Sequence, residues 1–508
     1  MTEELKAALR QDIDLFEEKI HAYDAGEVDK KAYKGFSGGF GSYAQRNGGN
    51  MLRLRMAGGR LDKDKLEFLA DSAEQYHIDR MKLTTCQTVQ LHNLSSQTVV
   101  ELMRAAMDVG IYTRGGGGDF PRNVMVSPLS GVQAGEYFDV LPWAEGAADY
   151  LLAKMRTIRM PRKLKVAFSN GPENLTHATF RDLGFVARPD GAFQVYCAGG
   201  LGPNPKLGVK VAEDVAPQDI LTCIDAMIAV FTTFGNYENR AKARTRYLQE
   251  VLGEEGLKAE FAKAMAAAQS PRLSVRPIVV DKAADGTAEG ERVIPQKQSG
   301  LYAVSYHPLG GNLAPAKTRE LYEIVKDMPQ VELRIAPGGT VYIINLTGKE
   351  AARVLAATGD GAVSDFEHSV CCIGASICQQ GVRDSQALLA AMIAAVRQAK
   401  LPADALPAVH ISGCPSSCGT HQVGTLGFQG CVKLVDKAPR PAFNLFVYGA
   451  ERQGQERLGE VLGSMLEQDI PAFMVELGQT VAASGLAFHP WLAGHGEELK
   501  TLAAKYIG

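Results

Sequence analysis

An internal repeat is the feature that most constrains how this chain can fold. The segment from about 50 to 110 predicts a strand, a helix, two strands and a helix, and the same order returns from 301 to 358. A constant shift of 252 positions places Gly58 on Gly310, and Leu69 on Leu321. The repeat predicts two related α+β halves, packed about a pseudo-twofold axis, with their shared crevice as the natural site.

The first copy has clear signals for its individual elements. MLRLRM predicts a strand, and KLTTCQTVQL predicts a hairpin or two short strands. In the second helix we expect Ser96 to be the N-cap and Gly110 to end the helix. The first helix should bury one apolar face, formed by Leu66, Leu69, Ala70 and Ala73.

Each copy continues into a longer α/β segment, which gives the chain several domains. The glycine run TRGGGGDF, at 113–120, predicts irregular backbone that lets a ligand approach closely. The polar stretch around 281–292 predicts a connection between the halves. The expected divisions are an N-terminal extension 1–45, a half-domain 46–112, an α/β domain 113–280, a linker 281–295, a second half-domain 296–358 and a second α/β domain 359–508.

Composition excludes several classes of partner. The chain has 508 residues with 54 basic and 57 acidic side chains, so nothing indicates nucleic acid or an anionic membrane surface. No apolar run approaches the roughly 18 residues that a membrane span needs. The N-terminus lacks the features of a secretory signal, so we expect a cytoplasmic location.

The two copies share a scaffold but differ in charge. Arg53 and Arg55 fall on Ser305 and His307 at the constant shift. Lys163 and Lys165 should share one face of a strand, where two ammonium groups repel unless an anion or solvent separates them. A solvated charged strand is the alternative. The first half carries cations such as Arg53, Arg122, Lys163 and Lys165, which the second half lacks, so in the simplest interpretation the first half binds an anion.

The second half holds a group of thiols instead. Five of the nine cysteines fall between 371 and 418, a clustering that argues against a scattered disulfide framework. Cys414 and Cys418 are four residues apart and would share a face if a helix began there. Zinc fits that spacing but not the five residues between Cys372 and Cys378, so the pattern favours an iron–sulfur cluster over zinc. Cys371 should point away from the site.

The cysteine motifs resemble the signature of the sirohaem-dependent sulfite and nitrite reductases. CCIGASIC is followed by GCPSSCG, and MLRLRMAGG, PRNV, PRKLK and IPQKQSGL extend the resemblance over essentially the whole chain. The resemblance implies two ferredoxin-like half-domains and two α/β domains around a sirohaem beside a [4Fe–4S] cluster. It implies a six-electron reductase of a small anion.

The resemblance also assigns roles by motif position. Cys372, Cys378, Cys414 and Cys418 match the cluster ligands, and Cys418 would bridge the cluster to the sirohaem iron. The four candidate cations match the family's anion-binding residues, in which lysines can supply protons. The residues matched to sirohaem contacts are Thr84, Gln90 and Arg162.

One position bears on the substrate. Lys163-Leu164-Lys165 matches the Lys-x-Lys of the family's sulfite reductases, whereas its nitrite reductases typically carry Lys-x-Asn. The expected reaction is therefore sulfite to sulfide, with nitrite to ammonia, or both, as the alternative. A protein that only carries electrons would not need the cations. No G-x-G-x-x-G dinucleotide motif is present, so electrons must come from ferredoxin or a separate flavoprotein.

The chain departs from the family pattern at several positions. The family usually carries an arginine where this chain has Cys86, so one contact to a cofactor carboxylate would be lost or supplied elsewhere. Ser416 stands in place of the usual asparagine, and APGGT replaces the commoner TxxQN.

Overall fold

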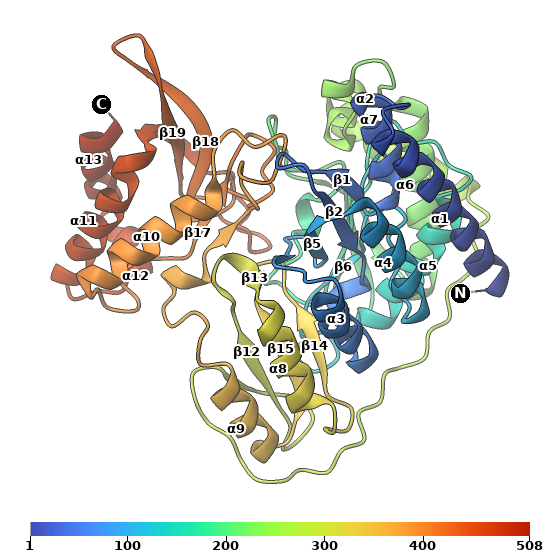
Figure 1. Ribbon diagram of the computed structural model, residues 1–508, viewed down its shortest axis with the longest axis horizontal. Helices are drawn as coiled ribbons and strands as arrows, with labels where there is room; N and C mark the ends of the chain where they lie inside the picture. The colour runs from blue at the N-terminus through green and yellow to red at the C-terminus, as the bar shows by residue number, and fades with distance from the viewer. Residues whose placement is uncertain (1, 508) are drawn as a thin grey trace.

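The computed structural model describes residues 2–507 and confirms the α+β fold with two related halves. Its strands form four sheets of five strands each. In Figure 1 the elements of the first half, blue to green, lie on one side, and the last domain, orange to red, lies on the other. The second half-domain, yellow, lies below and between them (Figure 1).

The repeat reappears in the backbone with the predicted shift. The shift of 252 carries β2 (Asn50–Leu54) onto β12 (Tyr302–Tyr306) and β5 (Val89–Leu94) onto β15 (Val341–Leu346). It also carries Gly58 onto Gly310, and both have φ of 60°. This left-handed conformation favours glycine, which explains the paired glycines found in the sequence.

The two half-domain sheets exchange a strand. β3 (Arg60–Leu61) leaves its own sheet and pairs with β14 (Glu332–Ile335), while β13 (Asn312–Leu313) pairs with β4 (Met81–Leu83). Each half-domain sheet is therefore completed by the other half of the chain. The sheet orders are β1-β2-β5-β4-β13 and β11-β12-β15-β14-β3, with β1 at Ser42–Ala44 and β11 at Val293–Pro295.

The two larger domains share one topology. In each sheet the first three strands are parallel neighbours, and the last two are added antiparallel. The first sheet contains β6 (Met125–Val126), β7 (Val166–Ser169), β8 (Leu183–Ala187), β9 (Phe193–Cys197) and β10 (Val209–Val215). The second contains β16 (Val370–Cys371), β17 (Val409–Ser412), β18 (Leu426–Val435), β19 (Ala438–Val447) and β20 (Glu460–Leu466).

Helices cover the sheets through apolar faces. The predicted stripe of α3 is buried, and the hairpin and Gly110 lie where expected. Ser95, not Ser96, is the N-cap of α4, because its side chain accepts a hydrogen bond from the Thr98 amide. The helices are α1 (Glu3–Asp24), α2 (Lys30–Ser37), α3 (Lys63–Gln75), α4 (Ser96–Asp108), α5 (Leu141–Lys154), α6 (Ile220–Phe234), α7 (Leu248–Ala267), α8 (Pro315–Val325), α9 (Gly348–Ala357), α10 (Ser385–Ala399), α11 (Ile470–Ala483), α12 (Phe488–Gly494) and α13 (Gly496–Ile507).

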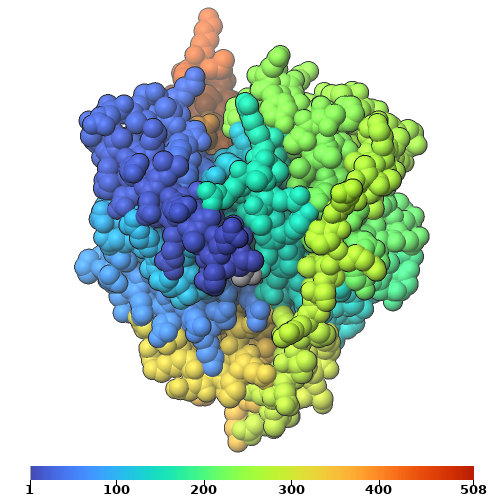
Figure 2. All heavy atoms as spheres, turned by 90° about the vertical axis from the view of Figure 1, so that its right-hand side faces the viewer, coloured from blue at the N-terminus to red at the C-terminus, as the bar shows by residue number. Residues whose placement is uncertain are grey.

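The connection between the halves is an extended segment on the surface. Residues 268–292 contain no helix or strand, so this segment begins earlier than the 281–295 linker expected from the sequence, and the last three residues of that linker form β11. The extension expected at 1–45 likewise ends in a strand, because β1 pairs with β2. Figure 2 shows the connecting segment, yellow-green, running down one face of the molecule.

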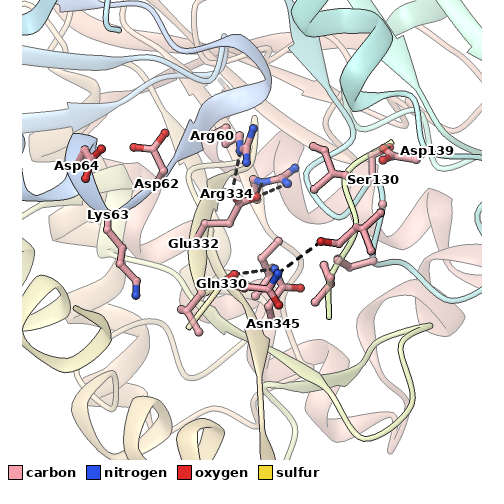
Figure 3. Close-up of a pocket in the computed structure, with 17 residues that line it drawn as sticks. Arg60, Asp62, Lys63, Asp64, Ser130, Asp139, Gln330, Glu332, Arg334 and Asn345 are labelled. Carbon is pink, nitrogen blue, oxygen red and sulfur yellow. Dashed lines mark hydrogen bonds and ion pairs between the residues drawn. The ribbon is translucent and has the colours of Figure 1, made fainter. Parts of the chain in front are cut away.

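A pocket of about 380 Å³ lies at the strand exchange, beneath this segment (Figure 3). Glu332 accepts hydrogen bonds there from Arg60, at 2.8 Å, and from Arg334. None of the predicted site residues lines this pocket. Its charged network joins β3 to β14 and thereby the two halves.

A search of residues 2–507 for membrane spans is negative, because no helix there combines the required length with enough apolar character.

Candidate functional site

The four predicted ligand cysteines lie on two loops at one sheet edge. Cys372 and Cys378 follow β16, and Cys414 and Cys418 follow β17. These strands are parallel neighbours, so their carboxyl ends meet at the same edge. Parallel pairing thus brings together two motifs that are about 40 residues apart in the sequence.

The thiols also interact with one another electrostatically. Burial raises the pKa of Cys372, and Cys414 adds to that rise. Burial likewise raises the pKa of Cys418, with contributions from Cys372 and Cys414. Hydrogen bonds favour a thiolate at Cys372, whose Sγ lies 3.2 Å from the Gly413 amide nitrogen. The thiolates repel one another. Binding of a positively charged iron–sulfur core can overcome this repulsion.

The backbone shows whether a helix begins near Cys414. Residues 413–424 form turns and not a helix, because Ser417 and Thr420 have left-handed φ values of 54° and 56°. Within residues 2–507, no three His, Cys, Asp or Glu side chains are close enough to hold a single metal ion. A cluster of four irons and four sulfides separates its thiolates more widely than one zinc ion does. Cys371 points away from this group, as expected, and contacts Gln386 at 2.9 Å.

The predicted lysines of the first half face Cys418 of the second. Lys163 and Lys165 immediately precede β7, and both lower the pKa of Cys418, against the effect of its burial. Burial lowers the pKa of Lys163 well below its ordinary value, and Arg244, Arg122 and Lys165 lower it further. The structure therefore places two ammonium groups and a thiol from different halves in one electrostatic neighbourhood.

The predicted arginines are held by the glycine run. Arg53 Nη1 donates to the Gly116 carbonyl at 2.5 Å, and Arg122 donates to the carbonyls of Gly116 and Gly118 at 3.1 and 2.8 Å. A Cβ at Gly117 would lie 2.3 Å from the Gly38 carbonyl oxygen. The glycines therefore let the run approach neighbouring backbone, and its carbonyls orient the two guanidinium groups.

The three residues matched to sirohaem contacts differ in their surroundings. Thr84 Oγ1 lies 2.6 Å from Thr88 Oγ1, and Gln90 is buried in β5 opposite Arg53. Arg162 already forms an ion pair with Asp119 at 2.6 Å. Thr85, which the sequence did not single out, donates to the Cys418 carbonyl at 2.9 Å.

Several basic residues of this region carried no sequence motif. Arg244 donates to Asp182 at 3.0 Å, and Arg246 donates to the Leu201 carbonyl at 3.2 Å. Only the basic run KARTR hinted at them. Within residues 2–507 some buried nitrogens here have no hydrogen-bond partner, namely Arg122 Nε, Arg244 Nε, Arg246 Nε and both ring nitrogens of His421. Buried unpaired donors beside an excess of cations suit a large polyanionic group.

Cys86 is a fifth thiol beside these cations. Its burial favours the neutral thiol, but Lys165, Arg181 and Arg53 outweigh burial and lower its pKa to about 6. In cofactor-free protein we expect iodoacetamide to alkylate Cys86 with half-maximal rate near pH 6, since the thiolate is the reactive form. Mass spectrometry of the Cys86 peptide across pH measures this rate.

Lys165→Asn should move the alkylation midpoint to higher pH, because it removes the charge that stabilises the Cys86 thiolate most. The buried thiol of Cys197, whose burial raises its pKa, is the internal control and should stay unmodified at pH 6. A Cys86 midpoint above pH 8 would contradict the expected thiolate.

Family models match the first half of the chain. The model described as "Nitrite/Sulfite reductase ferredoxin-like half domain" matches residues 43–109, and "Nitrite and sulphite reductase 4Fe-4S domain" matches residues 117–268. Over these two stretches the chain is similar to the nitrite and sulfite reductases. The second match covers the first of the two α/β domains, whereas the cysteine motifs lie in the second.

Some relatives of this chain are named nitrite reductases, and others are named sulfite reductases. "Ferredoxin--nitrite reductase" of Synechococcus elongatus is 26% identical, covering 84% of this chain and 85% of its own. "Sulfite reductase [ferredoxin]" of Mycobacterium tuberculosis is 26% identical, covering 75% and 69%. The solved structure of Mycobacterium tuberculosis NirA protein shares the fold, with a TM-score of 0.79 at 23% identity over 96% of this chain and 95% of that one.

The matched domain models and the reductases similar to this chain indicate an oxidoreductase with sirohaem and a [4Fe–4S] cluster as cofactors. The residues present fit both groups. Four thiols converge at one sheet edge, and cations with unpaired buried donors face them. Thiolates suit iron–sulfur clusters, and arginine suits the carboxylates of a tetrapyrrole.

Proposed function

We propose that this reductase converts sulfite to sulfide in a six-electron reaction. The observation that carries the proposal is the pair Lys163 and Lys165, both of which act electrostatically on Cys418. Two ammonium groups suit a dianionic substrate better than a monoanion. Nitrite reduction to ammonia is the second candidate, supported by the names of several relatives.

In this proposal Cys372, Cys378, Cys414 and Cys418 would hold the cluster, and Cys418 would also link the cluster to the sirohaem. The placement of the cysteines on adjacent parallel strands supports these roles. When bound, the coupled cofactors supply electrons one at a time to the anion. The proposed sirohaem contacts are Thr84, Gln90 and Arg162. Arg162 would contact the sirohaem while it is paired with Asp119.

The four cations perform separate tasks. Arg53 and Arg122, fixed by glycine carbonyls, keep their charge and hold the anion. Lys163 is the better proton donor, because burial lowers its pKa well below the ordinary value of a lysine. Each loss of oxygen as water consumes protons, so a donor next to the anion is required.

Electrons would come from a separate donor protein. Ferredoxin is the donor named for the relatives, and a separate flavoprotein is the alternative. Balanced charge gives no reason to propose nucleic acid or a membrane surface as partner. The proposed location is the cytoplasm.

Lys165→Asn tests the substrate. We expect the ratio of kcat/KM for sulfite to kcat/KM for nitrite to fall about tenfold, since one charge-assisted contact to the dianion is lost. The ratio is measured on purified holoenzyme with a dye as electron donor.

Lys206→Asn is the matched control, because that lysine forms a surface ion pair with Glu250 and lies outside the site. Its ratio should equal that of the unmodified protein. If Lys165→Asn also leaves the ratio unchanged, the preference for sulfite loses its basis.

A further inference from the structure

Arg181 is a buried arginine that the proposed reaction does not use. It directly follows the short 3-10 helix Ala178–Phe180, lies two residues before β8, and only 6% of its surface is exposed. Its Nε donates to the Thr176 carbonyl at 2.8 Å, and Nη2 lies 3.3 Å from His177 Nδ1. Among residues 2–507 its guanidinium forms no salt bridge with a carboxylate, and Nη1 has no hydrogen-bond partner.

Its neighbours fix the orientation of this guanidinium. An arginine only donates, so His177 Nδ1 must accept from it, and the ring proton is then on Nε2. His177 Nε2 lies 2.6 Å from the Glu451 carboxylate, to which it donates. Burial lowers the pKa of His177, so the ring is neutral at pH 7. A chain of contacts thus links Arg181 in the first half to Glu451 in the second.

Arg181 has neighbours of both charges. Burial lowers its pKa, Cys86, Asp182 and Glu451 raise it, and Arg244 lowers it. Asp182, which also acts on Arg181, is engaged by Arg244 and Thr245. No carboxylate forms a direct salt bridge with Arg181 within residues 2–507, so its open Nη1 can bind a further negative group.

We propose that Arg181 binds a carboxylate of the sirohaem, with its free Nη1 directed at that carboxylate and with His177 and Glu451 as positioning residues. Arg181 thereby supplies a cation next to Cys86, where this chain lacks the arginine expected from the sequence resemblance. The inference rests on the cofactor and is independent of whether sulfite or nitrite is the substrate.

The cofactor carboxylate suits this position better than the substrate anion. The guanidinium is held rigidly at Nε and Nη2, which favours a resident partner over one that must enter and leave at each turnover. The substrate cations Arg53 and Arg122 are held separately by the glycine run. Guanidinium and carboxylate also match in geometry.

Titration of the cofactor-free full-length protein with sirohaem tests the proposal. We expect Arg181→Asn to weaken sirohaem affinity about 10- to 100-fold, measured from sirohaem absorbance, since a hydrogen-bonded charge contact is lost. The urea unfolding midpoint of cofactor-free Arg181→Asn should differ from that of the unmodified protein by no more than the midpoint of a control variant does. That control is Arg292→Asn, which removes a part-buried arginine bound to the carbonyls of Ser305, Leu355 and Thr358, away from the site.

A charge-relocation variant separates charge from structure. Cys86→Arg combined with Arg181→Asn returns a guanidinium to the neighbouring position, and we expect it to recover at least tenfold of the lost affinity. The proposal is wrong if Arg181→Asn binds sirohaem within twofold of the unmodified protein. It is also wrong if the double variant binds no better than the single one, or if the single variant changes only KM for the anion.

Discussion

Replacing Cys418 with serine is expected to lower the reductase activity more than about 100-fold. Substitutions of residues that merely support a metal ligand cost about 10- to 100-fold, so loss of a proposed bridging ligand should cost more. Cys418 is also the thiol on which Lys163 and Lys165 act. The variant should lose the spectroscopic coupling between sirohaem and cluster, measured by electron paramagnetic resonance on anaerobically purified protein.

Cys431→Ser is the control for this variant. Cys431 lies in β18, outside the two cysteine motifs, and its Sγ contacts Asn444 Oδ1 at 3.4 Å. Its serine variant should retain iron, sirohaem and activity. A Cys418→Ser enzyme with unchanged coupling would refute the bridging role. If the variant loses the coupling but keeps its iron content, Cys418 contacts the sirohaem and is not needed to hold the cluster.

Glu332→Gln is expected to destabilise the cofactor-free protein by about 3 kcal/mol, the low end for breaking a buried ion pair. The Glu332 side chain is only 9% exposed and serves both Arg60 and Arg334, so neutralising it leaves two cations sharing one amide. The measurement is urea unfolding followed by circular dichroism. The loss should appear in the half-domains, which this carboxylate joins across the exchanged strands.

Glu145→Gln is the matched control, because Glu145 pairs with the same Arg60 but its side chain is 35% exposed. It should cost less than about 1 kcal/mol. Burial favours the neutral acid, but Arg334 and Arg60 lower the pKa of Glu332 below its ordinary value. The stabilisation by Glu332 is therefore complete above about pH 4.3 and disappears as the pH falls through the lowered pKa. Below that pKa the unmodified protein and Glu332→Gln should have the same free energy of unfolding. Equal costs for both variants at pH 7 would contradict this account.

The sequence was sufficient for the features that depend on local pattern. The repeat was predictable, because Gly58 and Gly310 need the same left-handed backbone at equivalent positions. The convergence of the cysteines was also predictable from their clustering between 371 and 418. Whether a helix begins at Cys414 could not be predicted, since ligand spacing cannot distinguish a helix from left-handed turns at Ser417 and Thr420.

Long-range features were not predictable from one sequence. A two-residue strand such as β3 has no periodicity from which to infer its partner, so the exchange with β14 could not be foreseen. Arg181 belongs to no motif, and its neighbours Cys86 and Glu451 are distant in the chain. The N-cap shift from Ser96 to Ser95 is a smaller error, because adjacent serines offer equivalent hydroxyls.

The exchanged strands have a consequence for synthesis on the ribosome. The edge of the first half-domain beyond β4 is completed by β13, which emerges only after the whole first half and the connecting segment have been translated. Until then β4 has an open edge that can pair with other nascent chains. Vectorial folding of this protein must therefore leave its earliest sheet unfinished until the second copy is made.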